Sequence, residues 1–144
     1  MKRVAIFLLI FTSFLIALNN DKPNFKNLNF RFIGPDGNRA IAISGVSNDH
    51  STYYVGAASG GLFKTTNKGI SWKPIFDDQD VSSVSAIAVS QKNPNILWAG
   101  TGETFLIRPA HAIGDGIYKS EDGGNTWKNM GLQKTARIAK IVIH

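Results

Sequence analysis

Short runs of β-branched and aromatic residues follow one another along the chain after residue 38, and polar turns separate them. Many of the fourteen glycines stand beside these runs. Such spacing is typical of frequent tight turns between short strands and not of long helices. The pattern therefore predicts an all-β fold.

The N-terminal segment 1–18 has a different pattern. It begins with two basic residues, continues as an apolar run of fifteen residues with only two polar positions, and is followed by a polar stretch at 19–21. This order is typical of a secretory signal peptide. The run is short for a membrane span of about twenty residues, although an uncleaved anchor stays an alternative. We expect the protein to be secreted, periplasmic or attached to the cell surface.

A sequence repeat covers most of the remaining chain. Residues 61–72 match 116–127 at a constant offset of 55. Upstream, residues 54–56 match 98–100 at an offset of 44, so the second copy carries eleven extra residues between the two blocks. Repeats of this length indicate an architecture built from similar units.

Each repeat is expected to form four short strands. In the second copy we place them at 84–90, 96–101, 116–120 and 126–130, and residues 138–143 repeat 84–89 at an offset of 54. Four strands in about 44 residues are typical of a β-propeller blade, a four-stranded antiparallel sheet. We therefore predict part of a larger propeller, with a lead-in, two complete blades and the first strand of a third at 19–38, 39–83, 84–137 and 138–144.

The matching turns share a motif: Ser or Thr, any residue, Asp, any residue, Gly, two variable residues, then Ser/Thr-Trp. The two copies, which differ from the motif only by Asn for Asp in the first, are Thr65, Asn67, Gly69, Ser71 and Trp72, and Ser120, Asp122, Gly124, Thr126 and Trp127. Asp or Asn can accept hydrogen bonds from nearby backbone amides, glycine allows positive φ, and tryptophan covers the turn. We expect a structural role for this motif and no catalytic role for its carboxylate.

This motif resembles that of the Asp-box, or BNR, repeat family. From residue 30 to 144 the chain is similar to the N-terminal part of secreted Vps10/sortilin-like and glycosyl-hydrolase-like propeller proteins. The resemblance is carried by residues 33–35, 54–61 and 98–103 together with the two motif copies. It implies a ring of many blades, in which the remaining blades are partners of this chain.

The extra residues of the second copy fall between its second and third strands. In a four-stranded meander this connection lies at the end opposite the motif turn, where propellers usually bind ligands, an analogy at the level of the fold. The side chains there could bind a sugar or an acidic group, or pair with one another. These candidate ligand-facing residues are Glu103, Arg108, His111 and Asp115.

The composition of the chain limits the classes of partner and cofactor that we expect. The formal charge is +6, but the sixteen basic residues are scattered among ten acidic ones, so we expect no nucleic-acid partner. The chain has no cysteine, which excludes disulfides and a lipoprotein signal. The acidic run 77–80 lacks the spacing of a calcium loop, and the three histidines lack the spacing of a zinc site. We expect no metal, no cofactor and no membrane contact after signal cleavage.

Three functions stay open at this stage. By elimination, we expect a binding or interaction scaffold for a protein, peptide or carbohydrate ligand. The alternative is the N-terminal part of a glycoside hydrolase, since Asp-box propellers include such enzymes. The xyloglucanase pattern has an aspartate before the glycine pair at 60–61, where this chain has Ser59, so we assign no catalytic residue. The third is a two-blade module that completes a ring by oligomerisation.

Overall fold

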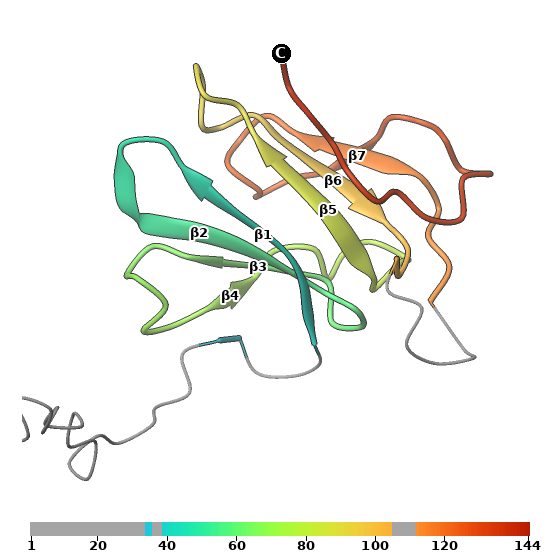
Figure 1. Cartoon of the computed structure of the whole chain (residues 1–144), viewed down its shortest axis with the longest axis horizontal. Helices are drawn as coiled ribbons and strands as arrows, with labels where there is room; N and C mark the ends of the chain where they lie inside the picture. Colours follow the sequence, from blue (N-terminus) through green and yellow to red (C-terminus); the bar gives the residue numbers. More distant parts are fainter. Residues whose placement is uncertain (1–33, 36–38, 105–111) are drawn as a thin grey trace, which may run out of the picture. The chain divides into compact units, whose positions relative to one another are not determined.

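The described residues form two antiparallel sheets of four strands each, in which the strand order follows the chain order (Figure 1). This computed structural model describes residues 34–35, 39–104 and 112–144. The strands are β1 (Ala40–Val46), β2 (Asp49–Ala57), β3 (Leu62–Thr65) and β4 (Lys73–Pro74) in the first sheet, and β5 (Val84–Val89), β6 (Leu97–Thr101), β7 (Ile117–Ser120) and β8 (Lys128–Asn129) in the second. No helix occurs in the described ranges, so the predicted all-β fold with two four-stranded sheets is confirmed.

The first two strands pair in the same register in both sheets. Ile43 of β1 stands opposite Val55 of β2, and their repeat equivalents, Ile87 of β5 and Ala99 of β6, stand opposite one another as well. In both pairs the register shifts near the start of the inner strand. The offset of 44 found in the sequence is therefore reproduced as the pairing of the inner hairpins.

The outermost strands are shorter than the sequence pattern predicts. β4 and β8 each have two residues. Pro74 has no amide hydrogen with which to continue a ladder. The backbone amide of Thr126, at the predicted start of β8, donates to the Asp122 carboxylate at 2.9 Å and is directed into its own turn.

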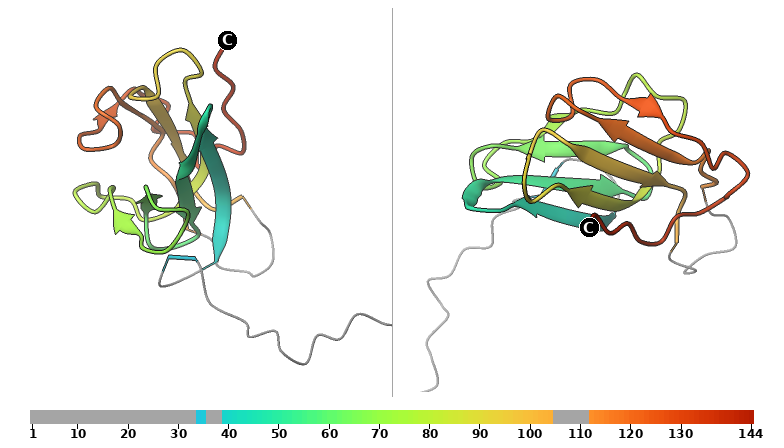
Figure 2. Two further views of the ribbon diagram at one scale, coloured as in Figure 1. Left: turned by 90° about the vertical axis from the view of Figure 1, so that its left-hand side faces the viewer. Right: turned by 90° about the horizontal axis from the view of Figure 1, so that it is seen from above.

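The core lies between the two sheets, where β1 and β2 contact β5 (Figure 2). Its buried side chains come from both sheets and from the connection between them, and include Tyr54, Leu62, Phe76, Val84 and Leu97. The approach is close at Gly56, where an added Cβ would lie 2.3 Å from the carbonyl oxygen of Val84. Any side chain at this glycine would push the sheets apart, so the repeat uses glycine at this point.

Residues 138–144 follow the second sheet without joining it. The amide of Ile138 donates to the carbonyl of Thr101 at 3.0 Å, and its carbonyl accepts from Ser85 Oγ at 2.7 Å. A Cβ on Gly100 would lie 2.6 Å from Ile138 Cγ2. Gly100 is the repeat equivalent of Gly56, so Ile138 approaches the second sheet where Val84 approaches the first. That this segment is the first strand of a third blade stays a prediction.

Candidate functional site

The second repeat turn, 120–127, is held by its own side chains. Asp122 Oδ1 accepts hydrogen bonds from the amides of Asn125 and Thr126, both at 2.9 Å, and Oδ2 accepts from the Thr126 hydroxyl at 2.6 Å. The buried Ser120 hydroxyl donates to Asp122 Oδ1 at 2.8 Å and accepts from the amide of Gly124 at 2.8 Å. The turn is thus closed by one carboxylate and two hydroxyl groups.

These hydrogen bonds decide the ionisation of Asp122. The Thr126 hydroxyl and amide, followed by the Ser120 hydroxyl, lower the pKa of this carboxyl to about 2. A carboxylate with so low a pKa is a poor general acid or base at neutral pH. As an ionised acceptor of hydrogen bonds, Asp122 therefore stabilises the turn.

The first repeat turn, 65–72, has the same construction with an amide in place of the carboxylate. Asn67 Oδ1 accepts from the amide of Ser71 at 2.9 Å, and Asn67 Nδ2 donates to the Ser71 hydroxyl at 2.8 Å. The buried Thr65 hydroxyl accepts from the amide of Gly69 at 3.0 Å. One difference is Lys68, which has φ of 61° where the second turn has Gly123.

The two tryptophans of the motif are both half-buried. Trp127 lies across the sheet interface with its ring at 76° to the ring of Phe76 and 5.2 Å between the ring centroids. Trp72 lines an apolar groove on the first sheet together with Ile43, Tyr53 and Val55. The sequence predicted that the two tryptophans occupy equivalent positions in the repeat. Their neighbours differ, because the two sheets have different surroundings.

At the opposite end of the second sheet, Glu103 is fully buried. Its carboxylate forms an ion pair with Arg39, which comes from the start of the first sheet. Its backbone amide donates to the carbonyl of Ala112 at 2.8 Å, and the Ala112 amide approaches its carboxylate at 3.5 Å. Glu103 therefore closes the base of the inserted loop and joins it to the first sheet.

Asp115 takes part in a second network at the same end. Its carboxylate accepts a hydrogen bond from the hydroxyl of Tyr118 at 2.5 Å. The Thr101 hydroxyl donates to the carbonyl of Gly116 at 2.7 Å and lies 3.3 Å from the Asp115 carboxylate. Thr101 in turn accepts from the amides of Asp115 and Gly116 at 3.0 and 3.1 Å. Burial, and next the bond to Asp115, raise the pKa of Tyr118. This arrangement fixes Asp115 beside the loop.

Sequence reasoning missed three residues that organise this end: Arg39, Thr101 and Tyr118. A signal for the last two was present, because the equivalent residues of the first repeat are Ala57 and Phe63, which have no hydroxyl group. The predicted residues Arg108 and His111 lie outside the described residues. Of the four candidates, the structure describes Glu103 and Asp115, which belong to two separate networks at the same end of the sheet. Their role toward a ligand stays a prediction.

In the described part of the chain, the features at issue are a cluster of metal-ligating side chains and an apolar helix long enough to span a membrane. No group of three or more His, Cys, Asp or Glu side chains that could hold a metal ion occurs there. The side chains of Asp77, Asp78 and Asp80 are exposed on the connection between the sheets. Within the same ranges, no helix has the length and apolar character needed to cross a membrane.

Comparison with known proteins identifies the fold. The structure is similar to an ancestral GH74 enzyme, with a TM-score of 0.55 and 21% identity, over 76% of this chain and 14% of that protein. It is also similar to the GH74 enzyme of Niastella koreensis, with a TM-score of 0.53 and 22% identity, over 70% of this chain and 15% of that protein. GH74 is a family of glycoside hydrolases with β-propeller folds. At this identity the likeness shows a propeller-like fold alone, and the chain spans about one seventh of each enzyme.

No protein family model matches the sequence. None of the curated proteins matches it either.

Proposed function

We propose that this chain is the exported part of a propeller that binds a ligand and does not itself cleave one. The observation that carries the proposal is the state of Glu103, the carboxylate at the base of the inserted loop. It is fully buried and paired with Arg39. In this pairing the carboxylate is the buried counter-charge of Arg39, which is a structural role, and none of its surface is exposed toward a substrate.

The ligand would meet the end of the second sheet where the loop inserted between β6 and β7 begins and ends. Asp115 is partly exposed there, and its orientation is fixed by Tyr118 and Thr101. A fixed carboxylate beside a loop that carries Arg108 and His111 suits the recognition of hydroxyl and carboxylate groups. Sugars and peptides both present such groups.

The alternative is that the chain contributes to a glycoside hydrolase, which the likeness to GH74 enzymes favours at the level of the fold. Most glycosidases place two carboxyl groups about 5 to 9.5 Å apart on either side of the scissile bond. The two carboxylates at the base of the inserted loop are both engaged, because Glu103 is buried against Arg39 and Asp115 accepts a hydrogen bond from Tyr118. We therefore rank this function second.

Calorimetric titration of the whole chain with soluble polysaccharides and acidic oligosaccharides tests the proposal. Binding is expected to weaken at least tenfold in Arg108→Ala, while Lys92→Ala is the matched control, because Lys92 is an exposed cation on the β5–β6 connection at the other end. Release of reducing sugar is measured in parallel. Hydrolysis that is lost in Asp115→Asn would replace this proposal by the enzyme alternative.

A further inference from the structure

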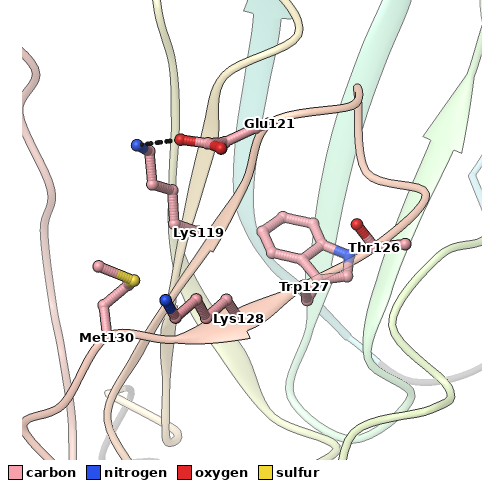
Figure 3. Close-up of a pocket in the computed structure, with 6 residues that line it drawn as sticks. All are labelled: Lys119, Glu121, Thr126, Trp127, Lys128 and Met130. Atoms are coloured by element: carbon pink, nitrogen blue, oxygen red, sulfur yellow. Dashed lines mark hydrogen bonds and ion pairs between the residues drawn. The ribbon is translucent and has the colours of Figure 1, made fainter.

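A hollow of about 220 Å³ lies on the face of the second sheet that points away from the first (Figure 3). We name it the outer hollow. Residues of β7, β8 and the second repeat turn line it: Lys119, Glu121, Thr126, Trp127, Lys128 and Met130. The ligand-binding proposal above makes no use of this surface.

Each of these six residues has a repeat equivalent 55 positions earlier, and those equivalents line a hollow on the first sheet: Lys64, Thr66, Ser71, Trp72, Lys73 and Ile75. The remaining residue that lines this first hollow is Asn125, which belongs to the second repeat turn. The first hollow therefore shows what such a surface binds, namely the repeat turn of the next sheet.

Three contacts hold the second repeat turn against the first sheet at the edge of the first hollow. Lys64 Nζ donates to the carbonyl of Gly123 at 2.9 Å, and the carbonyl of Ile75 accepts from the indole nitrogen of Trp127 at 2.7 Å. Gly124 packs so close to Ile75 that an added Cβ would lie 2.6 Å from Cδ1. The surface thus supplies a donor, an acceptor and an apolar contact for a glycine.

The outer hollow has the repeat equivalents of the two residues of the first sheet that make these contacts. Lys119 stands in place of Lys64, and it lies 5.7 Å from the Trp98 ring as Lys64 lies 5.5 Å from the Tyr54 ring. Met130 stands in place of Ile75 and its side chain is 45% exposed. Lys119 also pairs with Glu121 at 2.6 Å, but an ammonium group has three donors and can bind a turn carbonyl as well.

The occupant is identified by the segment 138–144. This segment already holds, against the second sheet, the position that β5 holds against the first, because Ile138 meets Gly100 as Val84 meets Gly56. A second copy of the chain would bring its own β1 to the same position and would collide with this segment. A sheet that uses 138–144 as its innermost strand has no such conflict.

We propose that the outer hollow is the docking site for the repeat turn of a third four-stranded sheet whose innermost strand is 138–144. A lysine-to-carbonyl bond, an indole-to-carbonyl bond and a glycine against Met130 define the partner. The partner is therefore a three-stranded meander with a motif turn like the two in this chain.

The test extends the whole chain after His144 by a copy of its own residues 91–137, since 138–144 already repeat 84–90. Hydrogen exchange of the backbone amides at 139–143 is measured in the extended and the unextended chain. We expect exchange at least about tenfold slower in the extended chain, because these amides become part of a ladder. The urea midpoint is expected to rise as well.

Met130→Asp is expected to abolish the protection in the extended chain and to leave the urea midpoint of the unextended chain unchanged. Leu132→Asp is the matched control, because Leu132 is 58% exposed and does not line the hollow. Equal exchange in both chains, or protection that survives Met130→Asp, would overturn the proposal. Self-association of the unextended chain that Met130→Asp abolishes would overturn it too, in favour of a second copy.

Discussion

The indole nitrogen of Trp127 donates a hydrogen bond of 2.7 Å to the backbone carbonyl of Ile75, which links the turn of one sheet to the last strand region of the other. The residue after Ile75 contributes to the same junction, because the Phe76 ring lies nearly perpendicular to the rings of Trp127 and Tyr118, with centroids 5.2 and 5.1 Å away. One tryptophan thus fastens two sheets that share no backbone ladder.

Trp127→Phe is expected to lower the free energy of unfolding by about 1 to 2 kcal/mol, since the ring contact is largely kept and the hydrogen bond is lost. Trp127→Ala should cost about 3 kcal/mol, at the low end for large core truncations because the ring is half-buried. Urea unfolding measures both. Trp98→Phe is the control, because the Trp98 indole makes no hydrogen bond within the described residues, and a loss as large as that of Trp127→Phe would contradict this account.

The hydroxyl of Ser120 supports the second repeat turn from inside. Ser120→Ala is expected to lower the free energy of unfolding by about 1 to 3 kcal/mol, because the buried amide of Gly124 loses its acceptor. Ser120→Thr keeps the hydroxyl, as Thr65 does in the first turn, and should be milder. Equal losses in both variants would show that the hydroxyl contributes nothing.

The pKa of Asp122 predicts a dependence of stability on pH. Its pKa is lowered from 3.8 to about 2 in the folded protein. The stabilisation is therefore present above about pH 4 and is lost as the pH falls toward 2. Asp122→Asn should remove this part of the pH dependence and cost less at pH 7 than Asp122→Ala. Denaturation midpoints between pH 2 and pH 7 measure it, and an unchanged acid limb in Asp122→Asn would refute it.

Lys68 adopts φ of 61° at a position where the second repeat turn has glycine. A residue with a side chain costs about 1 to 2 kcal/mol in this region. Glycine removes that cost, but it loses more conformational entropy on folding, so the net stabilisation is smaller. We expect Lys68→Gly to raise the free energy of unfolding by up to about 1 kcal/mol. Lys92→Gly, in a connection without positive φ, should give no gain, and a gain there would point to a general effect of removing charge.

The ion pair between Arg39 and Glu103 predicts a coupling between the sheets. Arg39→Met removes a counter-charge from a fully buried carboxylate, and we expect a loss of about 2 kcal/mol, less than the 3 to 5 kcal/mol of a fully buried pair because Arg39 is 37% exposed. The double variant with Glu103→Gln should recover part of this loss. A double-mutant cycle without coupling would contradict a direct contribution of the pair.

The sequence predicts much of the fold because the repeat has a local basis. The glycines, the turn motif and the alternating runs recur at fixed offsets, so the pairing of Ile43 with Val55 predicts that of Ile87 with Ala99. The ion pair of Arg39 with Glu103 was not predictable. It joins residues 64 positions apart, and the repeat contains no equivalent pair. Such contacts depend on how two sheets meet, which no single segment specifies.

The short outer strands have a consequence for solubility. β4 consists of Lys73 and Pro74, and β8 consists of Lys128 and Asn129. The outer edge strand of each sheet therefore has two residues, one of which is a lysine, and few backbone groups that could pair with another strand. A strand from another molecule has few backbone groups to pair with at this edge, and the lysines and the proline disfavour such pairing. Fibrillar growth by addition of strands is therefore disfavoured at the edges formed by β4 and β8.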